Sequence, residues 1–160
     1  MDRRWAIAAL LVGALAITFV ATREPELEPE AAIRAALERA ARAASEKNLD
    51  GTIDLLSERF KGPSGIDRSG AKRIVFVQLR QGDWSRVFFA RTSVELLDDG
   101  KKAKVVTHAV LARGKDVKTM EDVLPTSATV YRFELDMERE DDDYRVVHAE
   151  YGPAKLLDLK

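Results

Sequence analysis

The sequence predicts an α+β fold, with a curved antiparallel sheet of about four long strands and three N-terminal helices packed on one face. One transmembrane helix is predicted ahead of this domain. An apolar run and a change of pattern support the prediction. Residues Trp5–Thr22 are uncharged and mostly apolar, the region behind them repeats apolar side chains at a helical spacing, and the chain from Trp84 onward repeats them at every second position.

The run Trp5–Thr22 predicts a membrane anchor. Its eighteen residues would span roughly 27 Å as a helix, close to the bilayer core of about 30 Å. Arg3 and Arg4 precede the run, and basic residues favour the cytoplasmic side, so we expect the domain in the periplasm of a bacterium. A cleaved signal peptide is the alternative, because Ala14–Ala16 offers small residues for cleavage. The domain would then be secreted.

The chain divides into an anchor or uncleaved signal (1–23), an acidic linker with prolines (24–29) and one domain (30–160). Its 26 basic and 27 acidic residues leave no basic excess, so nucleic-acid binding is not expected. The chain has no cysteine, which excludes disulfides and lipid attachment through an N-terminal cysteine. No motif predicts a cofactor.

Three helices are predicted ahead of the strands. The first starts near Pro29, a residue that suits the first helical turn. Its apolar stripe comprises Ile33, Ala36, Leu37, Ala40 and Ala44. Asp50 is the predicted cap of a short second helix that reaches Leu56. The third helix is predicted from Arg68 to Arg80, with Gly82 as its stop.

Four strands follow with acidic turns between them. They are predicted at Ser85–Leu97, Ala103–Ala112, Ser127–Glu140 and Tyr144–Tyr151. Apolar and charged residues alternate most clearly in the third strand, which predicts one buried and one solvated face. The buried side comprises Thr129, Tyr131, Phe133, Leu135 and Met137, and the solvated side Arg132, Glu134, Asp136 and Glu138.

Two short motifs carry a resemblance to a known family. Residues Ala44–Leu56 end one helix in a polar stretch, after which Leu49-Asp50-Gly51 opens a short helix. The closing hairpin has an acidic turn, an aromatic residue and then Arg145-Val146-Val147. With this order of elements, the chain from Glu30 to Tyr151 resembles the nuclear transport factor 2-like superfamily, which includes SnoaL-like and ketosteroid isomerase-like proteins.

The resemblance implies a cone-shaped domain whose sheet and helices enclose a pocket. It also implies where an isomerase-like member would hold its reactive groups: an acid just before the proline that follows the second helix, and a tyrosine in the first helix. Here Gly62 precedes Pro63, and no tyrosine lies between Glu28 and Lys47. The fold is therefore expected without the isomerase chemistry, and the chain is not expected to be an enzyme.

Seven residues form the candidate pocket: Trp84, Phe88, His108, Tyr131, Phe133, Tyr144 and His148. The aromatic members either line an apolar cavity or fill the core. Strand alternation places His148 on one face with Tyr144, Val146 and Glu150. A histidine beside Tyr131 could act as an acid–base pair, although both histidines fit equally the role of hydrogen-bonded sheet residues. Two histidines without cysteines predict no metal site.

The leading hypothesis is an anchored, exported, non-catalytic domain that binds a small apolar ligand or a partner protein. One alternative is a structural subunit of an envelope assembly, because single-span proteins among type IV secretion assembly factors have a similar architecture. Another is an enzyme with a rearranged acid–base pair. Two copies could also pair through the exposed sheet face, at whose rim we expect Arg86, Arg91, Arg132 and Glu134.

Overall fold

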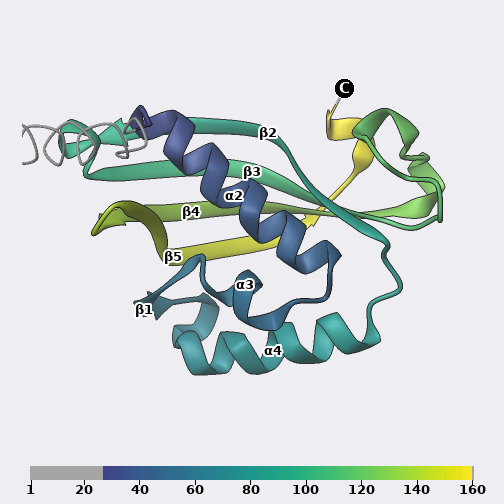
Figure 1. Cartoon of the computed structure of the whole chain (residues 1–160), viewed down its shortest axis with the longest axis horizontal. Helices are drawn as coiled ribbons and strands as arrows, with labels where there is room; N and C mark the ends of the chain where they lie inside the picture. Colours follow the sequence, from purple (N-terminus) through teal and green to yellow (C-terminus); the bar gives the residue numbers. More distant parts are fainter. Residues whose placement is uncertain (1–26, 160) are drawn as a thin grey trace, which may run out of the picture.

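The computed structural model describes residues 27–159, which form an α+β domain with a five-stranded sheet (Figure 1). The helices are α2 (Pro29–Ser45), α3 (Leu49–Ile53) and α4 (Arg68–Gln81), and the strands are β1 (Leu56–Lys61), β2 (Arg86–Leu97), β3 (Lys102–Ala112), β4 (Ala128–Glu140) and β5 (Asp143–Ala154). The sheet order is β1-β5-β4-β3-β2. Strand β1 runs parallel to β5, and the other neighbours are antiparallel. The predicted α+β class, the three helices and the four long antiparallel strands are confirmed, whereas the parallel edge strand β1 was not predicted.

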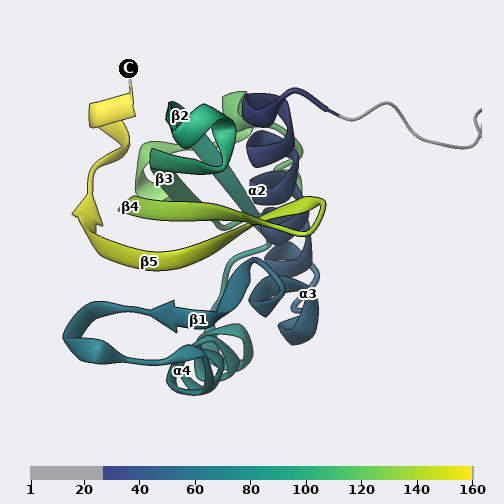
Figure 2. The ribbon, with the colours of Figure 1, turned by 90° about the vertical axis from the view of Figure 1, so that its left-hand side faces the viewer.

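Helix α2 lies across the sheet, over β2 and β5 (Figure 2). It begins at Pro29 as predicted. Of the predicted stripe, all members except Ala44 are buried, and Ala41 and Ala43 are buried in addition. Ile33 and Leu37 are at most 2 % exposed, and they reach into the main core. Because alanines occupy the other buried positions of α2, its backbone can approach the sheet closely.

The structure corrects the second helix in two respects. Its N-cap is Asn48, whose side-chain oxygen accepts a hydrogen bond from Gly51 N at 3.0 Å, rather than Asp50. The helix ends at Ile53, and Leu56 begins β1 instead of belonging to the helix. A six-residue strand interrupted by Glu58 and Arg59 has no clear alternation, so only its pairing with β5 reveals it.

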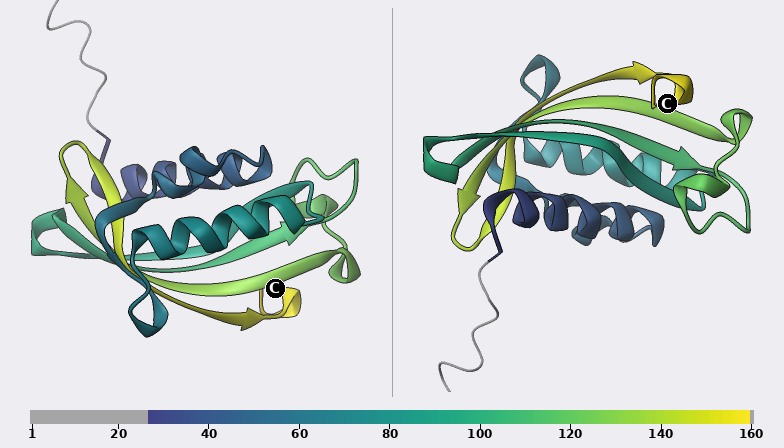
Figure 3. Two further views of the ribbon diagram at one scale, coloured as in Figure 1. Left: turned by 90° about the horizontal axis from the view of Figure 1, so that it is seen from below. Right: turned by 90° about the horizontal axis from the view of Figure 1, so that it is seen from above.

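The long strands have an inner face, on which the three helices lie, and an outer face (Figure 3). Two irregularities interrupt the register of these strands. One lies in β2 between Ala90 and Ser93, where Arg91 has a φ of 48°. The other lies in β5, where Val146 pairs with Met137 while His148 pairs with Asp136. Since an extra residue reverses the direction of the following side chains, each irregularity exchanges the two faces along its strand.

The main core fills the space between α2 and the inner face. Its buried members are Ile33, Leu37, Phe60, Ala103, Val105, Leu135, Met137, Tyr144, Val146 and Ala149. Among the described residues, Ser57 and Thr107 are the buried polar ones. The Oγ1 atoms of Thr107 and Thr92 lie 2.7 Å apart, so Thr107 is hydrogen-bonded where it is buried.

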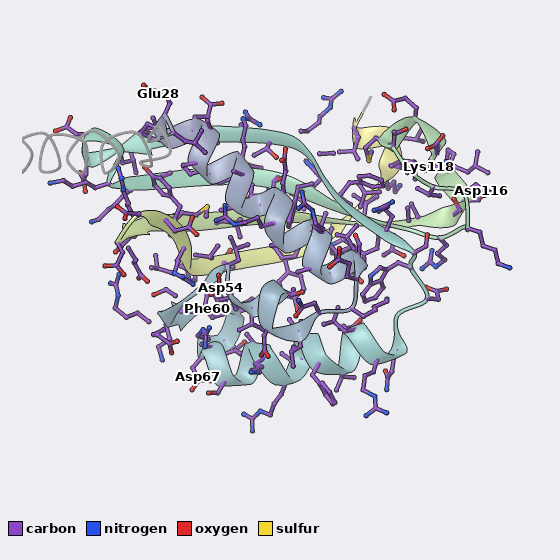
Figure 4. The ribbon with its side chains drawn as sticks, in the orientation of Figure 1. Glu28, Asp54, Phe60, Asp67, Asp116 and Lys118 are labelled. Carbon is purple, nitrogen blue, oxygen red and sulfur yellow. The ribbon has the colours of Figure 1, made fainter. Side chains whose placement is uncertain are left out.

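A smaller apolar cluster covers one end of the outer face. Val110 and Val130 form its floor, and residues of the β3–β4 connection and of the C-terminal turn Leu156–Leu159 pack on them. Asp116 and Lys118 lie toward the tip of that connection (Figure 4). The long connection therefore extends the core rather than standing free.

The predicted anchor Trp5–Thr22 and most of the linker lie outside the described residues. Within residues 27–159, no helix is long and apolar enough to cross a membrane. Helix α2 includes Pro29, so the domain begins one residue before the predicted boundary at Glu30.

Candidate functional site

The seven candidate residues divide between the two sides of the sheet. Four belong to the helix side, namely Trp84, Tyr131, Phe133 and Tyr144. Three lie on the outer face, namely Phe88, His108 and His148. The alternative of an acid–base pair between a histidine and Tyr131 does not fit the structure, because the sheet separates these side chains. The expectation that His148 shares a face with Tyr144 and Val146 is also wrong, because the irregularity at Val147 intervenes.

Trp84 joins the C-terminal ends of α2 and α4. Its indole Nε1 donates a hydrogen bond to Ala44 O at 3.3 Å, and Lys47 Nζ lies 3.4 Å from the ring centroid. Burial lowers the pKa of Lys47, and Asp83 partly offsets this. Because the indole is 9 % exposed and packs on Ala41, its role is to fill the core between the helices.

Tyr144 is likewise a structural residue. It is 2 % exposed, and its hydroxyl donates to the carbonyl of Gly100 in the β2–β3 turn. Gly100 has a φ of 80°, a conformation that glycine adopts readily. The tyrosine thus holds the turn against the core and leaves no hydroxyl for a ligand.

Three rings on the inner face form a cluster that we call the aromatic shelf: Tyr131, Phe133 and Tyr151. The rings of Phe133 and Tyr151 are stacked with centroids 5.5 Å apart, and Tyr131 meets Tyr151 edge-on at 6.3 Å. Phe133 packs against the main core, whereas Tyr151 is 54 % exposed. The shelf is therefore an apolar surface that continues the core into solvent.

Sequence reasoning missed Tyr151. The residue was the predicted end of the last strand, whereas β5 continues to Ala154. Once the irregularity in β5 is included, Ala149, Tyr151 and Pro153 alternate onto the inner face, opposite Leu135, Phe133 and Tyr131. The alternation of residues 149–153 was visible in the sequence. The irregularity that decides which face these residues occupy could not be located from the sequence.

The two histidines occupy different places on the outer face. His108 pairs with Arg132 across β4, and its buried Nδ1 has no hydrogen-bond partner among the described residues. Nδ1 of His148 lies 2.8 Å from Lys61 O, which identifies Nδ1 as the protonated nitrogen. His148 therefore ties β5 to β1, as a hydrogen-bonded sheet histidine would.

A groove of about 370 Å³ crosses the outer face from β2 to β5. Its acidic and basic lining residues are Glu95, Lys104, Glu134, Asp136 and Glu150, and His148 also lines it. Lys104 lies between Glu95 and Asp136 in the register, so opposite charges alternate along one row. The pairing of two copies through this face stays a prediction.

The carboxylates with shifted pKa values form structural contacts. Ser57 donates to Glu140 at 2.6 Å, and this hydrogen bond, with Arg59 at 3.0 Å, lowers the pKa of Glu140. A hydrogen bond from Arg113 lowers the pKa of Asp83 in the same way. No group of histidines and carboxylates in the described part of the chain could hold a metal ion. The site therefore offers an apolar surface on the inner face and charged side chains on the outer face.

Comparison with solved structures identifies the fold. The domain superposes on a candidate scytalone dehydratase from Novosphingobium aromaticivorans with a TM-score of 0.60 and 8% identity, covering 78% of this chain and 83% of that one. An NTF2-like (nuclear transport factor 2-like) protein of unknown function from Shewanella oneidensis superposes with a TM-score of 0.59 and 17% identity. The match covers 78% of this chain and 98% of that one. No family model and no curated protein matches the sequence. The fold is therefore NTF2-like, and these similarities establish no activity.

Proposed function

We propose that the chain is a non-catalytic binding module that holds a small apolar ligand against the aromatic shelf. The observation that carries the proposal is the exposed ring of Tyr151, which stacks on Phe133 above a closely packed core. Stacked and edge-on aromatic rings are favourable partners for an aromatic or aliphatic ligand. In this proposal Trp5–Thr22 tethers the module to the outer face of a membrane.

The chemistry of the inner face supports binding over catalysis. Proton transfer needs a titratable group within about 3 Å of the reacting atom. In the described part of the chain, the buried polar residues are Ser57 and Thr107, neither of which titrates near neutral pH. His108 and His148 lie across the sheet from the shelf. An apolar ligand on the shelf would thus meet the rings of Tyr131, Phe133 and Tyr151, with both histidines on the other side of the sheet.

The test uses the three tyrosines of the full chain, replaced throughout by 3-fluorotyrosine and observed by ¹⁹F NMR. Addition of 2-naphthol should shift the resonances of Tyr131 and Tyr151 saturably. The resonance of Tyr144 should stay in place, because that ring is enclosed by the core. Tyr151→Ala should weaken binding about two- to twelvefold, since an aromatic pair contributes roughly 0.5–1.5 kcal/mol.

Phe76→Ala is the matched control, because Phe76 on α4 is exposed to a similar extent, 45 % against 54 % for Tyr151. This variant should bind 2-naphthol as the parent does. Equal weakening by both substitutions, or shifts that never saturate, would show that the probe adsorbs to any exposed ring and would refute the shelf as a site.

A further inference from the structure

Helix α4 has an outward face of unusual composition. Its fourteen residues contain Arg68, Lys72, Arg73 and Arg80 and no acidic residue. The whole chain has a net charge of −1, so the residues outside α4 together carry −5. The helix thus concentrates positive charge on an otherwise acidic protein.

The four basic residues of α4 differ in whether they form ion pairs. Arg68 and Lys72 are paired, with Glu58 at 3.1 Å and Asp50 at 2.9 Å. In the described residues neither Arg73 nor Arg80 forms an ion pair. Arg80 instead lies over the ring of Phe76, with its guanidinium carbon 5.5 Å from the centroid. Two basic side chains are therefore available to an outside anion.

Apolar side chains lie beside these arginines. Ile74, Phe76 and Val77 are each 44–45 % exposed, whereas on the opposite side of α4 Leu79 is buried in the core and Val75 packs against it half-buried. A shallow hollow of about 590 Å³ lies on this surface, lined by Leu49, Ser69, Lys72, Arg73, Phe76 and Val77. Figure 3 shows the outward side of α4 with no other element over it, and Figure 4 places Asp67 at its start.

We propose that this face of α4 docks on the surface of an anionic phospholipid bilayer. A helix with arginines beside exposed aromatic and aliphatic residues suits that interface, because the apolar groups enter the acyl boundary while the arginines meet lipid phosphates. Each basic residue near an anionic leaflet adds attraction, and Arg73 and Arg80 have no ion-pair partner among the described residues to oppose it. The inference depends on α4 alone and holds whether Trp5–Thr22 spans the bilayer or not.

The experiment exploits the absence of cysteine in the full chain. Gln81→Cys at the end of α4, and separately Thr126→Cys in the β3–β4 connection, each carry one fluorescent label. Vesicles contain brominated lipids, which quench fluorophores in the acyl region. The label at residue 81 should be quenched with vesicles of phosphatidylcholine and phosphatidylglycerol, and little with phosphatidylcholine alone. The label at residue 126 should be unquenched in both.

Charge variants complete the design. Arg73→Gln with Arg80→Gln should reduce quenching at residue 81 to the level seen with phosphatidylcholine alone. Lys101→Gln with Lys115→Gln removes the same charge from exposed positions outside α4 and should leave quenching unchanged. The proposal is overturned if the label at residue 81 is quenched equally by anionic and by pure phosphatidylcholine vesicles, or if anionic vesicles do not quench it. Protection of residue 81 only in native membranes that contain other proteins would assign the face to a protein partner and would equally overturn it.

Discussion

Gly82 allows the indole of Trp84 to reach its place between α2 and α4. A Cβ atom added at residue 82 would overlap the six-membered ring of Trp84, far below the 3.0 Å that real Cβ atoms keep. The backbone at Gly82 has a φ of −67° and a ψ of 134°, which alanine adopts without strain. Glycine is therefore required at residue 82 by the position of the Trp84 side chain and not by the backbone conformation.

The size of the effect follows from what the displaced ring would lose. The hydrogen bond from Trp84 Nε1 to Ala44 O contributes about 1 kcal/mol, and the contact with Lys47 contributes about 0.5–1 kcal/mol. Repacking around the added methyl group costs about 1–3 kcal/mol. These terms amount to about 2.5–5 kcal/mol, and after the gain of about 0.4–1 kcal/mol from replacing glycine we expect Gly82→Ala to lower the free energy of unfolding by about 1.5–4.6 kcal/mol. Without the clash, the same substitution would stabilise the protein by about 0.4–1 kcal/mol.

The assay is urea unfolding of the full chain in mild detergent, followed by far-UV circular dichroism. Gly152→Ala is the matched control, because a Cβ at Gly152 would meet nothing within 4 Å. A second test places Gly82→Ala in a Trp84→Ala background, where the clash is gone and the substitution should be neutral or stabilising. Equal destabilisation in both backgrounds would refute the role assigned to the indole.

The remaining predictions concern the core and its pH dependence. Tyr144→Phe should cost about 1–2 kcal/mol in urea unfolding, because the carbonyl of Gly100 loses its buried donor; an unchanged midpoint would contradict that hydrogen bond. Hydrogen bonds from Ser57 and Arg59 lower the pKa of Glu140 in the folded protein. The ionised carboxylate therefore adds to the free energy of unfolding above its ordinary pKa near 4.5, and this stabilisation is lost as the pH falls through the lowered pKa. Glu140→Gln should therefore destabilise the protein at pH 7 and converge with the parent in acid. A constant difference across that range would refute the assignment.

The sequence predicted the elements whose signals are local. The stripe of Ile33 and Leu37 marked α2, and the alternation around Leu135 marked β4 with the correct buried face. Both patterns arise within a few residues, because a helix or a half-buried strand selects apolar side chains at its own period. That Gly62 precedes Pro63 was equally visible without a structure.

The candidate site depended on features that are not local. The strand Leu56–Lys61 forms because it pairs with β5, which lies far along the chain. Its own sequence shows no regular alternation of apolar and polar residues. The irregularity at Val147 decides that His148 faces outward and Tyr151 inward, since one extra residue exchanges the faces. The sequence by itself therefore determined which elements form and which side of most of them is buried. Tertiary pairing alone decided which rings meet, because register and irregularities are set by contacts between distant strands.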